Sequence, residues 1–325
     1  MSIVAVAHPN LALVKYWGKA DTGLNLPASG SIGISLGAFS TTTRLRLEAA
    51  NSGSSTWEVS INGRTQDPER FRDFFDEALK GYSGEPRHIV VASENDFPTA
   101  AGLASSASGF AALAGAVNRG LNLNLNDSDI SALARRGSGS ATRSVSGGFV
   151  AYPEKAASAR QLHRENHWPE LRCVIVQVSS GKKAVSSRKA MEASRTTSPY
   201  YPAWIEDSRK LVDQARDAIA DRDLDALGPV IRRSYLRMFS TMFSADDPVM
   251  FWQEASIRVM NIAAELRKNG IAAWETMDAG PQVKIITLET QVEAVLTALE
   301  AGRSGADDWV ISVSGIGSGL KVREE

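Results

Sequence analysis

The periodicity of the apolar residues changes near residue 180, and this change limits the folds open to the chain more than any other feature. Before it, runs such as TTTRLRLEA (41–49) alternate apolar and polar side chains, as half-buried antiparallel strands do. From Lys189 to Asn269 the spacing is mostly helical, and strand-like runs return after it. We therefore expect an α+β chain of two domains, residues 1–180 and 181–325.

The composition is that of an ordinary globular protein without a bulk charge. Of the 325 residues, 43% are apolar and 22% are charged, and the formal net charge is −1. This balance gives no general attraction to nucleic acid or to a membrane surface. We expect neither a signal peptide nor a membrane helix, so the expected location is the cytoplasm. The one cysteine, Cys173, lies in the apolar run LRCVIVQV and is predicted to be a buried strand residue.

The stretch PTAAGLASSASG, residues 98–109, places small residues and two hydroxyls at the start of a predicted helix. A helix N-terminus offers unpaired N–H groups and a partial positive charge, which favour phosphate. Gly102 leaves the backbone bare, and Ser105 and Ser106 add hydroxyls for a phosphate or a magnesium ion. The chain has no Walker A motif. Close packing of a small-residue helix is the alternative explanation.

A second small-residue run, RRGSGSATRS, covers residues 135–144. Hydroxyls beside guanidinium groups suit a carboxylate or a phosphate. The first two arginines are also what a solvated helix C-terminus favours. Arg143 lies beyond that helix among small residues, so it is the better candidate for a ligand-binding residue, together with Ser138 and Ser140.

A third run, NLALVKYWGK, brings a phenol and two ammonium groups close together in the sequence. Lys15, Tyr16 and Lys19 fall within five positions. The alternative for each lysine is simple solvent exposure, and for Lys15 the sequence leaves that alternative open.

The fourth run, TMDAGPQVK, places Asp278 between a predicted strand and an Ala-Gly-Pro turn. An aspartate before a glycine is common in turns, so an ordinary Asx turn is one explanation. A carboxylate facing an anion-binding loop is the other.

Together the four runs resemble one enzyme family. N-x-A-x-x-K-Y-W-G-K, S-E-N-x-F-P-T-A-A-G-L-A-S-S-A, R-R-G-S-G-S-A-x-R-S and D-A-G-P occur in this order, as they do in the diphosphomevalonate decarboxylases of the GHMP kinase superfamily. The resemblance covers essentially the whole chain. It implies the two-domain α+β GHMP kinase fold, with an N-terminal half like domain 2 of ribosomal protein S5, a ferredoxin-like C-terminal half and an active site in the cleft between them.

The resemblance also implies the chemistry. Members of the family use ATP and Mg²⁺ to convert mevalonate 5-diphosphate into isopentenyl diphosphate, ADP, phosphate and CO2, and they are often homodimers. The tertiary 3-hydroxyl is phosphorylated, and the phosphate leaves as the carboxylate is lost. The alternatives are a mevalonate 5-phosphate decarboxylase, a small-molecule kinase that stops after phosphorylation, and an inactive anion-binding protein.

Residue roles follow from the same resemblance. Asp278 would orient or deprotonate the tertiary hydroxyl, Arg143 would hold the substrate carboxylate, and Lys19 would act beside them. The remaining substrate-binding residues would be Asn10, Tyr16, Ser138, Gly139, Ser140 and Ser198. The ATP-binding residues would be Ser93, Pro98, Ala101, Gly102, Leu103, Ala104, Ser105 and Ser106, the last two also facing Mg²⁺.

Two positions depart from the family pattern. The family usually has Asn after D-A-G-P, where this chain has Gln282, and some bacterial members have Arg where this chain has Pro199. Both positions concern the phosphate tail, so a substrate with one phosphate or with two fits the sequence.

Overall fold

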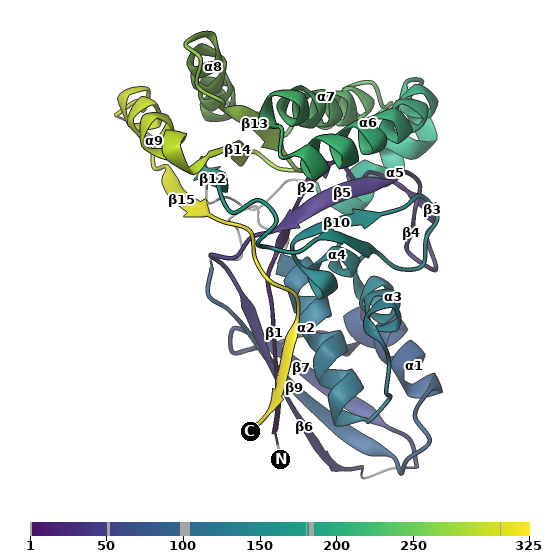
Figure 1. Cartoon of the computed structure of the whole chain (residues 1–325). Helices are drawn as coiled ribbons and strands as arrows, with labels where there is room; N and C mark the ends of the chain where they lie inside the picture. The colour runs from purple at the N-terminus through teal and green to yellow at the C-terminus, as the bar shows by residue number, and fades with distance from the viewer. Residues whose placement is uncertain (1, 51–52, 98–104, 180, 182–184, 306) are drawn as a thin grey trace.

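The computed structural model describes the chain except for residues 1, 51–52, 98–104, 180, 182–184 and 306. It is a mixed α+β structure, as expected, and its described strands form three main sheets and one short hairpin (Figure 1). Within the described part of the chain, no helix is long and apolar enough to cross a membrane.

The first sheet has both ends of the chain near one edge. Its strand order is β16-β1-β6-β9-β7-β8, and β7 runs parallel to β9 whereas the other neighbouring pairs are antiparallel. Ser2 accepts from and donates to the backbone of Glu325, which places the two termini side by side (Figure 1). The strands are β1 (Ser2–Ala7), β6 (Thr41–Ala49), β7 (Thr56–Ile61), β8 (Arg64–Thr65), β9 (Arg87–Asn95) and β16 (Lys321–Glu324).

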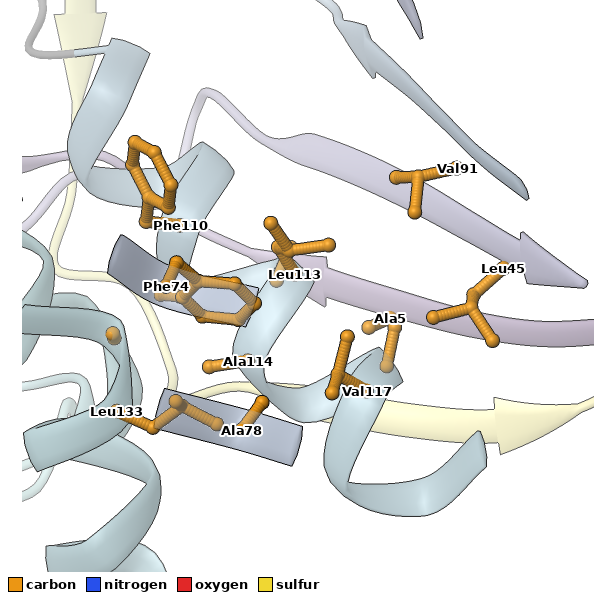
Figure 2. Packing of buried hydrophobic residues seen from close by; sticks show 14 of the residues in the cluster. Ala5, Leu45, Phe74, Ala78, Val91, Phe110, Leu113, Ala114, Val117 and Leu133 are labelled. Carbon is orange, nitrogen blue, oxygen red and sulfur yellow. The ribbon is translucent and has the colours of Figure 1, made fainter. Parts of the chain in front are cut away.

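Three helices cover one face of this sheet. Figure 2 shows Phe110, Leu113 and Val117 of the central helix in one cluster with Leu45 and Val91 of the strands. Because the apolar residues of β6 alternate, one face of that strand packs on the helices while the other stays polar. The helices are α1 (Arg72–Lys80), which follows a 3-10 turn at Pro68–Phe71, α2 (Ser105–Gly120) and α3 (Asp127–Gly137).

A four-stranded sheet forms the middle layer, and its central strands are buried on both faces. The order is β11-β10-β5-β2. Helices α6 (Tyr201–Asp221) and α7 (Leu224–Phe243) pack on this sheet, and the short helix α4 contacts β5 and β10. The elements are β2 (Asn10–Val14), β5 (Ser31–Ser35), α4 (Ala141–Ser146), β10 (Phe149–Tyr152) and β11 (Arg160–His163), with a small hairpin of β3 (Lys19–Asp21) and β4 (Leu26–Pro27) beside them.

The third sheet is antiparallel and carries most of the later helices. Its order is β13-β14-β12-β15, so β12 pairs with strands that come more than a hundred residues later. In the described residues, β12 and β16 each pair with strands from the other side of residue 180. The strands are β12 (Leu171–Gln177), β13 (Trp274–Met277), β14 (Val283–Leu288) and β15 (Val310–Ser314); the helices are α5 (Ser187–Thr197), α6 (Tyr201–Asp221), α7 (Leu224–Phe243), α8 (Glu254–Lys268) and α9 (Val292–Ala301), the last after a 3-10 turn at Glu289–Gln291.

Candidate active site

Asp278 lies in the turn between β13 and β14, and two lysines hold its carboxylate. Lys15 follows β2 and places its Nζ 2.9 Å from Oδ1, whereas Lys284 belongs to β14 and places its Nζ 3.3 Å from Oδ2. The lysine side chains are 1% and 2% exposed, but the aspartate side chain is 34% exposed. The two ammonium groups therefore lie behind the carboxylate, which faces the solvent-accessible side.

The charges of this cluster set its ionisation. Burial by itself would raise the pKa of Asp278, but the ammonium groups of Lys15 and Lys284 outweigh it and hold that pKa well below the ordinary range. Burial lowers the pKa of Lys15, an effect that Asp278 opposes. Lys15 also donates to the carbonyl oxygen of Ala12 at 2.7 Å. The low pKa of Asp278 therefore favours its ionised form.

Arg143 is buried in α4 among neutral partners. Its Nε donates to Oδ1 of Asn10 at 2.9 Å, and its Nη1 donates to the Ser31 hydroxyl at 2.8 Å. Burial lowers the pKa of Arg143, and Asp278 opposes this through space. Gly33 makes room for the guanidinium, since a Cβ there would lie 2.9 Å from Nε. A buried cation held by neutral groups has unused capacity for an anion.

The Asn10 side chain ties β2 to the run that contains Arg143. Its Nδ2 donates to the Ser140 carbonyl at 2.9 Å and to the Ser144 hydroxyl at 2.7 Å. Because the same amide accepts from Arg143, the asparagine orients the guanidinium and the loop before α4 together.

A row of hydroxyls links the first turn of α2 to the same loop. The Ser106 and Ser138 hydroxyls are 3.4 Å apart, and those of Ser138 and Ser140 are 3.1 Å apart. The buried hydroxyl of Tyr16 has no hydrogen-bond partner among the described residues. Burial raises the pKa of Tyr16 to about 12, so its phenol is protonated and can donate.

Lys19 is the first residue of β3 and donates to Oδ1 of Asn25. The Asn25 amide in turn donates to the carbonyls of Arg135 and Arg136 at 3.1 and 3.0 Å, which joins Lys19 to the end of α3. Burial, followed by the charge of Arg188, lowers the pKa of Lys19. The site is therefore rich in donors and positive charge, which suits an acidic, phosphorylated ligand.

Comparison with known proteins settles the family. A model described as the diphosphomevalonate decarboxylase-like N-terminal domain matches residues 7–161, and a model described as the mevalonate 5-diphosphate decarboxylase C-terminal domain matches residues 173–317. The chain belongs to the diphosphomevalonate decarboxylase family.

Relatives and solved structures agree with this placement. Diphosphomevalonate decarboxylases from Candida albicans and Homo sapiens are each 32% identical to this chain, over 92% and 93% of it and over 87% and 80% of their own lengths. The mevalonate diphosphate decarboxylase from Staphylococcus aureus superposes with a TM-score of 0.91 at 34% identity, covering 99% of this chain and 98% of its own. A structure named MDDEF in complex with MVAPP, AMPPCP and magnesium has a TM-score of 0.90 at 36% identity, with 100% and 99% covered.

The structure brings most of the site residues that the sequence predicted for this member of the diphosphomevalonate decarboxylase family into connected groups. Asp278 pairs with Lys15, Arg143 donates a hydrogen bond to Asn10, and Ser106 contacts Ser138 of the loop at residues 138–140, here called the serine loop. Gly139 lies against the Tyr16 phenol, where a Cβ would come 2.6 Å from its oxygen. Ser105 opens α2 beside Ser106. The expected nucleotide-binding residues Pro98, Ala101, Gly102, Leu103 and Ala104 lie outside the described residues.

Two expected site residues contact other parts of the protein. The Ser93 hydroxyl is 2.8 Å from that of Thr43 within the first sheet. The Ser198 hydroxyl, buried where α5 ends, is 2.7 Å from that of Ser244. These bonds leave their expected roles toward ATP and substrate as predictions.

The departure from the family pattern at Gln282 has a structural consequence. Its Oε1 accepts from the Val178 backbone at 2.7 Å, and its Nε2 donates to the Ser179 carbonyl at 2.6 Å. Gln282 thus fastens the end of β12 to the turn that carries Asp278. Pro199, the residue that follows Ser198, is exposed.

The sequence reasoning missed two features of this family site. Lys15, for which solvent exposure was left open, is buried, and Lys284 was not singled out. The signal for Lys284 was available: it interrupts the run QVKIITL, whose strand is buried almost throughout. A lysine inside a buried strand requires an acidic partner or a ligand.

Proposed function

We propose that this protein catalyses the ATP-dependent decarboxylation of mevalonate 5-diphosphate to isopentenyl diphosphate, with ADP, phosphate and CO2 as the other products. The observation that carries the proposal is the ionised Asp278, held by two buried ammonium groups within the electrostatic reach of the buried Arg143. Family membership and a related structure named with MVAPP, AMPPCP and magnesium support it.

In this mechanism Asp278 accepts a hydrogen bond from the tertiary hydroxyl of the substrate. This bond directs a lone pair of the hydroxyl oxygen toward the terminal phosphorus of ATP. Because its pKa is low, Asp278 is a weak base, and orientation outweighs deprotonation in its role. The proton passes to Asp278 late, once the new oxygen–phosphorus bond has made the hydroxyl acidic. Such timing suits the loose transition state of phosphoryl transfer.

Arg143 acts in the second half of the reaction. The phosphorylated oxygen leaves with its bonding electrons, and the electrons of the bond to the carboxylate form the new double bond as CO2 departs. We assign the substrate carboxylate to the free part of the Arg143 guanidinium, whose Nε and Nη1 are already bonded to Asn10 and Ser31. Held in one orientation, the carboxylate can lie in line with the leaving oxygen.

The donor groups around the serine loop fit the phosphate tail. We assign the tail to Tyr16, Lys19, Ser138 and Ser140, with Gly139 leaving space beside the phenol, and we keep Ser198 as a further substrate contact. Tyr16 brings a buried hydroxyl without a described partner, which a phosphate oxygen would satisfy.

The start of α2 fits the phosphates of ATP. This helix has 16 residues and begins with two adjacent serines, and within the described chain its first turn holds no acidic side chain. N–H groups and a positive dipole end there favour anions, and the Ser105 and Ser106 hydroxyls would complete the coordination of Mg²⁺. Bound with ATP, Mg²⁺ neutralises phosphate charge.

The proposal is tested by incubating the protein with Mg-ATP and, separately, carboxyl-labelled mevalonate 5-diphosphate and mevalonate 5-phosphate. We expect one CO2 for each ADP with the diphosphate. ADP without CO2 would identify a kinase that stops after phosphorylation. Turnover of the monophosphate alone would move the proposal to a mevalonate 5-phosphate decarboxylase.

We further propose that the chain works as a homodimer, as the family resemblance implies, and that it works in the cytoplasm, the location expected from the sequence. Light scattering coupled to size-exclusion chromatography should give about twice the 34.9 kDa of one chain. A mass of one chain at micromolar concentration would reject the dimer, and recovery of the native protein in a membrane or secreted fraction would reject the location.

A further inference from the structure

Lys284 is a buried charged residue. The need of Asp278 for a cationic partner does not by itself explain why Lys284 is there. It lies on β14 opposite Thr276 of β13 and Ile175 of β12, in a strand whose described side chains are almost all buried. Lys15 already gives Asp278 a closer ammonium partner, at 2.9 Å against 3.3 Å for Lys284. A second buried lysine costs desolvation energy that an apolar residue would avoid.

The charges near Asp278 are unequal in number. The groups that act on it or on its partners are the cations Lys15 and Lys284 and, from α4, Arg143. Cys173 of β12 is also near, but burial raises the pKa of its thiol to about 12, so the thiol is neutral. Among the described groups, three cations therefore surround one carboxylate. The excess of positive charge favours the binding of an anionic ligand.

Each of the two lysines contacts a different oxygen of the Asp278 carboxylate. Lys15 bonds Oδ1 from the β2 side, and Lys284 contacts Oδ2 from within the hairpin that carries Asp278 itself. A carboxylate held at one oxygen can still turn about its own axis, whereas one held at both oxygens keeps a single plane. The outward-facing lone pairs then point in one direction.

We propose that Lys284 is a positioning residue for the phosphoryl-transfer step: it holds Oδ2 of Asp278 so that the carboxylate meets the tertiary hydroxyl in one orientation and stays ionised while phosphate charge gathers beside it. The inference rests on the proposed function for its substrate. The pairing of Lys284 with Asp278 is a property of the protein alone and can be tested without substrate.

The kinetic test compares Lys284→Met with wild type and with Lys268→Met, a matched change at an exposed lysine that pairs with the exposed Glu265. For Lys284→Met we expect kcat to fall roughly 10- to 100-fold with KM for the substrate little changed, because a misplaced group costs rate more than binding. The acid limb of the pH profile of kcat/KM should move up by about 1 to 2 pH units, as expected when a carboxylate loses one cation.

A purely structural role would give another pattern. Lys284→Met would then unfold more easily but keep the acid limb of the wild type, and this result would overturn the proposal. Lys284→Arg should restore the position of the acid limb, since it returns the charge. If the methionine variant does not fold, Lys284→Gln removes the charge while keeping a donor, and the same shift of the acid limb is required of it.

The substrate-free test follows the carboxyl carbon of Asp278 by NMR in protein labelled with ¹³C at aspartate carboxyls. Comparison with Asp278→Asn assigns the signal. We expect its titration midpoint to be higher in Lys284→Met than in wild type by about 1 unit or more. An unchanged midpoint overturns the positioning role, whereas a raised midpoint in a protein that releases no CO2 rejects only the proposed function.

Discussion

At the scale of single residues, the site depends on an acid that is kept ionised and on cations that are kept buried. Asp278 exposes a third of its side chain, while the lysines behind it are nearly inaccessible. Water screens little in such a place, so each charge acts strongly on its neighbours. Substitutions here should therefore change the ionisation of the neighbouring groups.

Replacing Asp278 by Asn keeps its shape and removes its charge. We expect substrate binding close to normal and turnover lower by about 10² to 10⁴, the range typical for loss of a positioned acid–base group. Steady-state kinetics beside equilibrium binding of the substrate would measure both. Near-normal turnover would show that another group orients the hydroxyl.

The ionisation of Asp278 also predicts how stability depends on pH. Its pKa in the folded state lies below the value of about 3.9 for an unfolded chain. The ionised carboxylate thus contributes stability that is full above that unfolded value and is lost as the pH falls through the folded-state pKa. Urea unfolding of wild type and Asp278→Asn at pH 7, 5, 4 and 3 should show a difference that shrinks only at the acid end. A difference that grows on acidification would contradict the sign.

Arg143 is predicted to serve binding and decarboxylation together. Arg143→Gln should raise KM and lower CO2 release roughly 10- to 100-fold, because a bond to a charged group is worth about 1.5 to 3 kcal/mol. Arg143→Lys keeps the charge but loses the fork that bonds Asn10 and Ser31, so it should restore binding only in part. An unchanged KM in the glutamine variant would place the carboxylate elsewhere.

At the scale of elements, β5 matters because it has no side chain at Gly33, where the Arg143 guanidinium lies. Gly33 faces Arg143, and a Cβ there would lie 2.9 Å from both its Nε and the Leu11 carbonyl. Two short elements thus set the position of the guanidinium. They are β5, which has no side chain at Gly33, and the helix α4, which packs on β5.

Gly33→Ala is therefore expected to displace Arg143. We predict a loss of stability of about 1 to 3 kcal/mol, as for other overpacked sites, and a raised KM. Gly109→Ala in α2 is the control: a Cβ there meets no atom within 4 Å, so stability should rise by up to about 1 kcal/mol. Chemical unfolding of both variants measures the contrast, and equal behaviour of the two would refute the packing argument.

At the scale of the whole molecule, the chain returns to its start. After β15, Leu320 donates to the Val145 carbonyl at the end of α4, and β16 then pairs with β1 at the edge of the first sheet. The last residues thus fasten the helix of Arg143 as well as the sheet. The division of the chain at residue 180 stays a prediction, since β12 and β16 both pair across it.

Removal of residues 321–325 should expose β1 as a free edge. We expect a lower melting temperature, by several degrees, and faster aggregation, because an unpaired strand edge recruits other chains. Thermal unfolding and light scattering would detect both effects. Unchanged melting would mean that β16 contributes little to the sheet.

The sequence by itself determined the main elements and part of the group of residues around Arg143 and Asp278. Local periodicity predicted the strand-rich first half and the helical run after residue 180, and short motifs predicted the residues that the structure groups around Arg143 and Ser138. Such features depend on neighbours a few positions apart, so they can be read along the chain. Only the tertiary structure decided that Lys15 and Asp278, 263 positions apart, form an ion pair with Lys284 beside it. The physical reason is that burial and pairing are properties of the packed sheets, and no local pattern states which side of a strand a distant segment will cover.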